Sequence, residues 1–154
     1  MPSTTFLQSL LKNFATLGFI GYLPIAPGTW GTLAGLIFVM VADLSIPVHL
    51  TLIMAVTVFG VISSGVAEKV IGETDSEHII IDEFAGFLVS VFFLPHTYSY
   101  LIAGFLLFRI FDILKPFPIG KLEKAFKGGA GIMADDILAG IFTNMMLQIW
   151  IKIF

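Results

Sequence analysis

The chain contains no cysteine among its 154 residues. This absence excludes disulfide bonds, metal sites built on thiolates and catalysis by a cysteine nucleophile. Basic residues are also scarce. The chain has eight lysines and arginines and eleven aspartates and glutamates, which gives a formal net charge of −3. A basic surface for binding nucleic acid is therefore not expected.

Charge of either sign is rare. Charged residues make up 12% of the chain, whereas ordinary soluble domains carry about 25%. Hydrophobic residues make up 57% before glycine is counted, and the mean hydropathy is +0.99. A soluble domain of this size lacks the interior volume to bury so much apolar surface. We therefore expect a single membrane-embedded domain, residues 1–154, of the all-α class.

Tracts without charged residues predict the membrane-spanning helices. Four such tracts occupy residues 13–42, 44–67, 84–108 and 137–151. Stretches of about 18 or more apolar residues are candidate transmembrane helices. The prolines and glycines of "GYLPIAPGTWG" suit a loop, and "LPHTYSY" suits an interfacial turn that would divide the third tract. Five short spans then follow, at about residues 32–45, 50–67, 79–94, 98–114 and 136–154.

The distribution of positive charge chooses between five spans and four, the alternative being one kinked helix over residues 84–108. With five spans, one side of the membrane carries Lys12, Lys69, Arg109, Lys115, Lys121, Lys124 and Lys127. Only Lys152 is left for the other side. Because cytoplasmic loops are rich in lysine and arginine, we favour five spans and expect the first side to be cytoplasmic. Four spans would divide the basic residues across the membrane.

The N-terminal segment predicts an additional amphipathic helix. Residues 6–17, "FLQSLLKNFATL", place leucines and phenylalanines on one helical stripe and polar residues largely on the other. This pattern is typical of a helix lying in the membrane interface. A helix packed against the bundle would give the same pattern, so both arrangements stay open.

Three clusters of acids stand at the cytoplasmic ends of the expected spans. They are Asp82 with Glu83, Asp112 alone, and Asp135 with Asp136. Five carboxylates gathered in one bundle would repel one another unless a cation held them. Oxygen-only ligands select Mg²⁺, Mn²⁺ or Ca²⁺. Solvated carboxylates at helix N-termini are the alternative for any one cluster, but three clusters on one face favour a metal site.

Small residues follow the acids at helical spacing. Asp82 and Gly86 are four residues apart, as are Asp136 and Gly140, with Asn144 one turn further. Residues four apart share a helix face, and small residues there let helices approach closely. We therefore expect these acids to face neighbouring helices instead of lipid.

Groups able to bind phosphate accompany the acids. Glycine in "APGTWGT" leaves backbone N–H groups accessible, and Gly28, Thr29 and Thr32 of this expected loop could bind an anion. The motif also suits a turn and a helix cap. A second glycine-rich stretch, "KGGAGIM", is expected to be a flexible loop. Arg109 lies three residues before Asp112 and can meet it on one helix face.

Four motifs together resemble a known family. They are "GYLPIAPGTWGTLAG", "IIIDEFAGF", "FRIFDILKPFPI" and "GGAGIMADDILAG", in this order between about residues 21 and 142. The set resembles the phosphatidylglycerophosphatase A family of bacteria. The resemblance implies a Mg²⁺-dependent phosphatase of the inner membrane that acts on a phospholipid in the bilayer. It would convert phosphatidylglycerophosphate to phosphatidylglycerol and inorganic phosphate, in phospholipid biosynthesis.

The resemblance also implies roles for individual residues. The family's motifs fall on Asp82 and Glu83, on Arg109, Asp112 and Lys115, and on Asp135 and Asp136. The residues expected to be catalytic are Asp82, Glu83, Asp112 and Asp136. We expect all five carboxylates to hold one or two Mg²⁺ ions, and Arg109 and Lys115 to bind phosphate. The general base would be Glu83 or Asp82, and a covalent aspartyl-phosphate stays open.

Two other functions fit the same residues. Intramembrane acids beside glycine-bearing helices also mark cation pathways, so a small cation carrier is one alternative. A phosphatase of another lipid phosphate is the second, because head-group selection depends on pocket shape. Short helices would bury the acids better in a homo-oligomer, so self-association also stays open.

Overall fold

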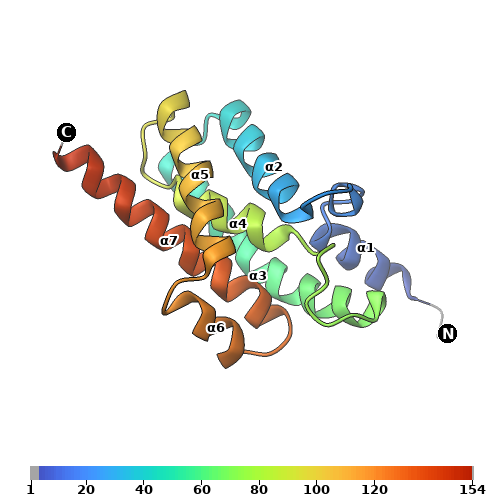
Figure 1. Ribbon diagram of the computed structural model, residues 1–154. Coiled ribbons are helices and arrows are strands. Elements are labelled where there is room, and N and C mark those ends of the chain that lie inside the picture. The colour runs from blue at the N-terminus through green and yellow to red at the C-terminus, as the bar shows by residue number, and fades with distance from the viewer. Residues whose placement is uncertain (1–3, 154) are drawn as a thin grey trace.

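The computed structural model describes residues 4–153, without the side chains of residues 122–124. The ends of the expected domain range and the side chain of Lys124 therefore lie outside the described residues. Within the described part the chain is all helical, which confirms the expected class (Figure 1). Its elements are α1 (Phe6–Ala15), the short 3₁₀ helix η1 (Ile20–Tyr22), α2 (Pro27–Ala42), α3 (Ile46–Ile71), α4 (Ile81–Ser90), α5 (Tyr98–Leu114), α6 (Ile119–Ala125) and α7 (Gly129–Ile153).

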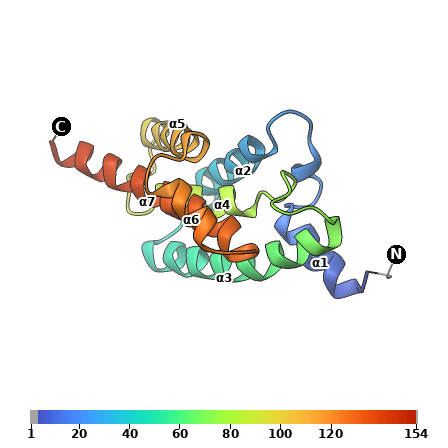
Figure 2. The same ribbon diagram turned by 60° about the horizontal axis from the view of Figure 1, so that its bottom comes forward.

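The short helix α4 lies at the centre of the molecule. It packs against α2, α3, α5 and α7, and Figures 1 and 2 show these longer helices around it. The side chains of Ile81, Ala85, Phe87 and Leu88 are fully or almost fully buried. The two acids that open this helix, Asp82 and Glu83, are themselves partly buried.

The crossing of α4 and α7 depends on glycine. A Cβ atom on Gly86 would lie 2.6 Å from the carbonyl oxygen of Asp136. On the facing helix, a Cβ atom on Gly140 would overlap the carbonyl oxygen of Gly86. One turn further, the side-chain amide of Asn144 donates to the carbonyl oxygens of Ser90 and Phe92, at 3.1 and 2.6 Å. The expectation that glycines below the acids permit close packing is confirmed.

Two helices in the described chain, α3 and α7, are long and apolar enough to cross a membrane, judged by length and composition. Helices stand at all five expected places, but α2 has 16 residues, α4 has 10 and α5 has 17. At about 1.5 Å per residue these reach about 15–26 Å, short of a hydrocarbon core of about 30 Å. The five-span topology therefore stays a prediction.

The N-terminal helix α1 combines both arrangements left open by its sequence. It packs against α3, yet Phe6 and Leu7 are 81% and 64% exposed. Its first turn is closed by a capping box, in which Thr5 and Gln8 exchange side-chain and backbone hydrogen bonds. A helix that packs on the bundle and also presents apolar side chains outward remains compatible with a membrane interface.

Two expected loops are helical in part, so these predictions were wrong for residues 27–31 and 129–133, whereas residues 23–26 do form a loop. Helix α2 already begins at Pro27, because proline is well suited to the first helical turn. Helix α7 begins at Gly129, so most of "KGGAGIM" is helix. Gly129 is required for the packing of α7 against α3 and not for flexibility, because a Cβ atom on Gly129 would overlap the carbonyl oxygen of Val61 in α3.

Candidate active site

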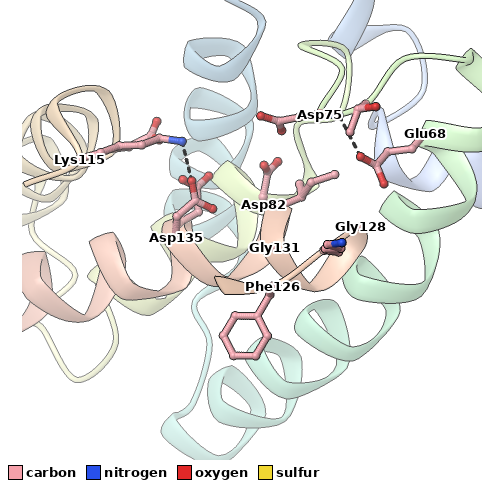
Figure 3. A pocket seen from close by; sticks show the side chains of 13 residues that line it. Glu68, Asp75, Asp82, Lys115, Phe126, Gly128, Gly131 and Asp135 are labelled. Atoms are coloured by element: carbon pink, nitrogen blue, oxygen red, sulfur yellow. Dashed lines mark hydrogen bonds and ion pairs between the residues drawn. The ribbon is translucent and has the colours of Figure 1, made fainter. Parts of the chain in front are cut away.

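A cavity of about 420 Å³ opens where α3, α4, α5 and α7 meet (Figure 3). Its lining includes acids from all three predicted clusters, namely Asp82, Asp112, Asp135 and Asp136. Lys115, which follows α5, also lines it. The helix ends that carry the acids are therefore neighbours in space, as expected from the sequence.

Three carboxylates form the tightest group. One oxygen atom from each of Asp82, Glu83 and Asp136 lies within 4.8 Å of the other two. Asp82 and Glu83 stand in the first turn of α4, and Asp136 comes from the second turn of α7. The close crossing of these two helices brings the three side chains together.

The three carboxylates have unused hydrogen-bonding capacity. Within residues 4–153, Asp82 Oδ1, Glu83 Oε2 and Asp136 Oδ2 are buried and have no hydrogen-bond partner. Buried polar atoms in folded proteins are almost always paired, so such a group calls for an explanation. Three convergent oxygen ligands without nitrogen or sulfur are the donor set that Mg²⁺ and similar hard cations prefer. The residues present therefore fit a divalent cation.

The other two acids of the expected set are held in ion pairs. Arg109 Nη1 lies 2.5 Å from Asp112 Oδ2, which confirms the expected contact between residues three apart. Lys115 Nζ lies 2.7 Å from Asp135 Oδ2, shown as a dashed line in Figure 3. The second oxygen of Asp135 is buried and, within the described chain, has no hydrogen-bond partner. The five carboxylates thus divide into a close group of three and two members held in short ion pairs of 2.5 and 2.7 Å.

Arg109 connects the acids with α2. Besides Asp112, its Nη1 donates to Thr32 Oγ1 at 3.3 Å and lies 3.9 Å from Glu83 Oε1. Its Nε is buried and has no acceptor among the described residues. A guanidinium group carries five donors in a fixed fork, so one donor of Arg109 stays unused in this arrangement. Neither Arg109 nor Glu83 is among the described residues that line the cavity.

The expected anion cradle of α2 contributes indirectly. Gly28 lies directly against the carboxylate of Glu83, and a Cβ atom there would overlap Glu83 Oε1. Thr32 donates to the carbonyl oxygen of Gly28 at 3.0 Å and accepts from Arg109. None of Gly28, Thr29 and Thr32 is among the described residues that line the cavity. Gly28 and Thr32 therefore help position Glu83 and Arg109, while the Thr29 side chain makes no hydrogen bond to these groups in the described chain.

The far wall of the cavity was missed by the sequence reasoning. It includes Glu68 and Thr74, together with Asp75, Phe126 and Gly131. Glu68 Oε1 accepts a hydrogen bond from the backbone N–H of Asp75 at 2.8 Å (Figure 3). The only signal available was that Glu68 ends the second uncharged tract on the same face as the other acids.

Local charge is strongly negative. Among the described residues, the acids that line or adjoin the cavity exceed the basic residues by four formal charges. The seven acids are Glu68, Asp75, Asp82, Glu83, Asp112, Asp135 and Asp136, and the three basic residues are Arg109, Lys115 and Lys127. The cavity could not accept a phosphate dianion without further positive charge. The arrangement is therefore suited to binding cations and an anion together, and not an anion alone.

Comparison with known proteins gives one family and several relatives. A family model described as phosphatidylglycerophosphatase A matches residues 13–151. Proteins of Haemophilus influenzae and Escherichia coli named "Phosphatidylglycerophosphatase A" are each 36% identical, over 84% and 82% of this chain and 83% and 75% of their own length. A Bacteroides thetaiotaomicron protein named "Putative phosphatidylinositol-3-phosphatase" is 35% identical over 84% of this chain and 86% of its own. No solved structure matches the chain.

Proposed function

The chain belongs to the phosphatidylglycerophosphatase A family, and from this membership we propose that it removes the terminal phosphate of phosphatidylglycerophosphate. The products are phosphatidylglycerol and inorganic phosphate, which is a step of phospholipid synthesis. The observation that carries the proposal beyond the family name is the group of Asp82, Glu83 and Asp136, whose buried oxygens converge beside the cavity. Lys115 lines this cavity, and Arg109 contacts Glu83. Family membership also favours a phosphatase over a cation carrier.

We propose Mg²⁺ as the cofactor, held first by Asp82, Glu83 and Asp136. A bound divalent cation would neutralise phosphoryl oxygens and activate a water molecule for attack on phosphorus. The excess of four negative charges supports two divalent cations over one, because one would leave the cavity negative. Asp112 and Asp135 are the further carboxylates for a second ion, each now paired with a cation of the protein.

Arg109 and Lys115 are proposed to hold the phosphate. Arg109 offers its buried Nε, and its position is fixed by Asp112 and Thr32. Lys115 lines the cavity, and its ammonium group forms an ion pair with Asp135 there. Charge-assisted hydrogen bonds of this kind are short and orient phosphoryl oxygens, and positioning contributes much of the catalysis of phosphoryl transfer.

Of the two candidates for the general base, we propose Asp82. Its side chain lines the cavity and points into it in Figure 3, whereas Glu83 is held between Gly28 and Arg109. A general base must reach the proton that it removes, directly or through one water molecule. Asp82 meets this requirement for a water molecule that enters the cavity.

We also propose that the protein is embedded in the bacterial inner membrane, with the cavity on the cytoplasmic side. This is supported by the two long apolar helices α3 and α7 and by large exposed apolar side chains on α2, α3, α5 and α7. The side proposed as cytoplasmic carries seven of the eight basic residues. The acyl chains of the substrate could then stay in the bilayer while its phosphate reaches the acids.

The direct test is release of inorganic phosphate from phosphatidylglycerophosphate in detergent micelles. Release should need Mg²⁺, stop with EDTA, and be lost in Asp82→Asn and Asp136→Asn proteins that remain folded. No release by folded wild type would overturn the proposal. Lys152→Gln, at the opposite end of the molecule, serves as the control variant.

The relative from Bacteroides thetaiotaomicron supports a second candidate, a phosphatase of phosphorylated phosphatidylinositol. Both substrates are phosphate monoesters on a diacylglycerol lipid, so the acids and Arg109 would serve either. The two differ in the part of the head group that would face Glu68 and Thr74 on the far wall. Comparing kcat/KM for the two lipids with one enzyme preparation separates the candidates.

A further inference from the structure

A second, apolar groove lies beside the acid cavity, between α3 and α7. It measures about 230 Å³, and its lining includes Thr57, Val61, Phe126, Ala130, Ala134 and Ile137. Thr57 supplies the only polar side chain among these residues. Apart from the hydroxyl of Thr57, these residues offer a ligand no hydrogen-bonding or ionic group.

The groove and the acid cavity share a wall. Phe126, half exposed between α6 and α7, lines both of them. Along the first turns of α7, Ile132 and Asp135 face the cavity while Met133 and Ala134 face the groove. A molecule with an anionic head and an apolar tail could therefore lie across Phe126 with one part in each.

The groove extends from the level of the acid cavity along α3 and α7, which is the direction that the acyl chain of a lipid would take from its head group. Its walls belong to the two helices of the described chain that are able to cross a membrane. On α3, Val61 and Thr57 stand seven and eleven residues before the cavity residue Glu68. At about 1.5 Å per residue, the groove extends about 10–17 Å from the level of Glu68 toward the middle of α3. In the proposed topology this is toward the centre of the bilayer.

Resting on the proposed function, we propose that this groove holds one acyl chain of the lipid substrate and so aligns its phosphate with the acids. Moving an acyl chain from the surrounding lipid into an apolar groove changes little in hydrophobic energy. The groove would therefore act through orientation, which is a large factor when a reacting group must meet a fixed site.

A larger apolar cleft between α5 and α7 provides a matched control. It measures about 610 Å³ and is lined by Ala103, Leu107, Met146 and Trp150, among others. Met146 and Trp150 lie ten and fourteen residues beyond Asp136, about 15–21 Å along α7. An acyl chain there would lie beside the far end of α7 and share no wall with the acid cavity.

The first test is photolabelling with phosphatidic acid that carries a diazirine in one acyl chain, with attachment sites mapped by mass spectrometry. Labels should concentrate on Phe126, Val61 and Ile137, and Ala134→Phe should reduce them about fivefold or more. Ala103→Phe should not change them. Labels spread evenly over the lipid-facing helices, concentrated in the α5–α7 cleft, or replaced by contacts with a second copy of the chain would overturn the proposal.

The second test compares substrates of different chain length. Ala134→Phe should lower kcat/KM about tenfold for the long-chain lipid and less than about twofold for a short-chain lipid with the same head group. Equal losses on both substrates would mean a structural defect and overturn the proposal. If Ala134→Phe does not fold, Thr57→Phe fills the same groove from α3. The positions labelled in the wild-type protein also test the acyl-chain site without any substitution.

The two proposals fail separately. Folded wild type that releases no phosphate but is labelled in the groove would overturn the proposed reaction and support the acyl-chain site. Wild type that releases phosphate but is not labelled there would overturn only the acyl-chain site.

Discussion

Gly86 of α4 and Gly140 of α7 meet without side chains between them, and a Cβ atom on Gly140 would overlap the carbonyl oxygen of Gly86. Each glycine stands one turn beyond an acid, Asp82 in one helix and Asp136 in the other. The distance between the two acids is therefore set by the absence of two methyl groups. A metal site that depends on this crossing needs the glycines as much as the carboxylates.

Gly140→Ala should separate the two helices and impair both folding and activity. The added methyl group meets backbone, which cannot move aside as a side chain could, so we expect a loss of about 1–3 kcal/mol in the free energy of unfolding. Phosphate release should fall further than the loss of folded protein explains. Thermal unfolding in detergent and activity per folded molecule measure the two effects.

Gly65→Ala is the matched control for this substitution. A Cβ atom on Gly65 in α3 would lie 3.5 Å from its nearest neighbour, the backbone nitrogen of Gly129, which is an ordinary contact. Alanine also favours a helix over glycine by about 1 kcal/mol. Equal damage by both substitutions would contradict the role given to the crossing of α4 and α7.

The group of three acids should dominate metal affinity. We expect Asp82→Asn and Asp136→Asn each to weaken Mn²⁺ binding about tenfold or more, since each removes a ligand oxygen from the tight group. Asp135→Asn should weaken it less, because one oxygen of Asp135 already holds Lys115. Titration of Mn²⁺ followed by electron paramagnetic resonance gives affinity and stoichiometry without turnover. An equal effect of all three substitutions would refute the division of the acids.

Arg109→Lys should show that shape matters as well as charge. Lysine keeps the positive charge but lacks the planar set of donors of a guanidinium group. It therefore cannot hold Asp112 and Thr32 and at the same time offer a further donor to phosphate. We expect kcat/KM to fall about 100-fold. Mn²⁺ affinity should stay within about threefold of wild type. Kinetics and metal titration on one preparation check both, and an unchanged kcat/KM would remove Arg109 from phosphate binding.

Much of the site could be predicted because its acids mark the ends of uncharged tracts. Asp82, Asp112 and Asp136 interrupt apolar sequence at points that a membrane bundle brings to one face, and the glycines at helical spacing indicated the close crossing. The contact of Arg109 with Asp112 followed from their spacing within one helix. These inferences needed only helical periodicity and the cost of burying charge.

Other features depended on tertiary structure that local sequence does not contain. Asp135 and Lys115 are twenty residues apart, and their ion pair depends on how α6 and the segments beside it return the chain to α7. Thr74 reaches the cavity through the path of the segment between α3 and α4, and Glu68 reaches it because α3 packs against α7. Glycines such as Gly129 were interpreted as flexible loop residues, although close packing of helices is what requires them.

A double substitution can decide whether Lys115 binds phosphate or only neutralises Asp135. Lys115→Met leaves the largely buried carboxylate of Asp135 without its 2.7 Å partner, so it should lower both stability and activity. If neutralisation were the only role, Lys115→Met combined with Asp135→Asn would restore activity, because the buried charge would be gone. We expect stability to recover in the double variant while kcat/KM stays about tenfold or more below that of Asp135→Asn alone, because a cation facing the phosphate is still missing. Full recovery of kcat/KM would assign Lys115 a purely structural role and leave Arg109 as the phosphate ligand.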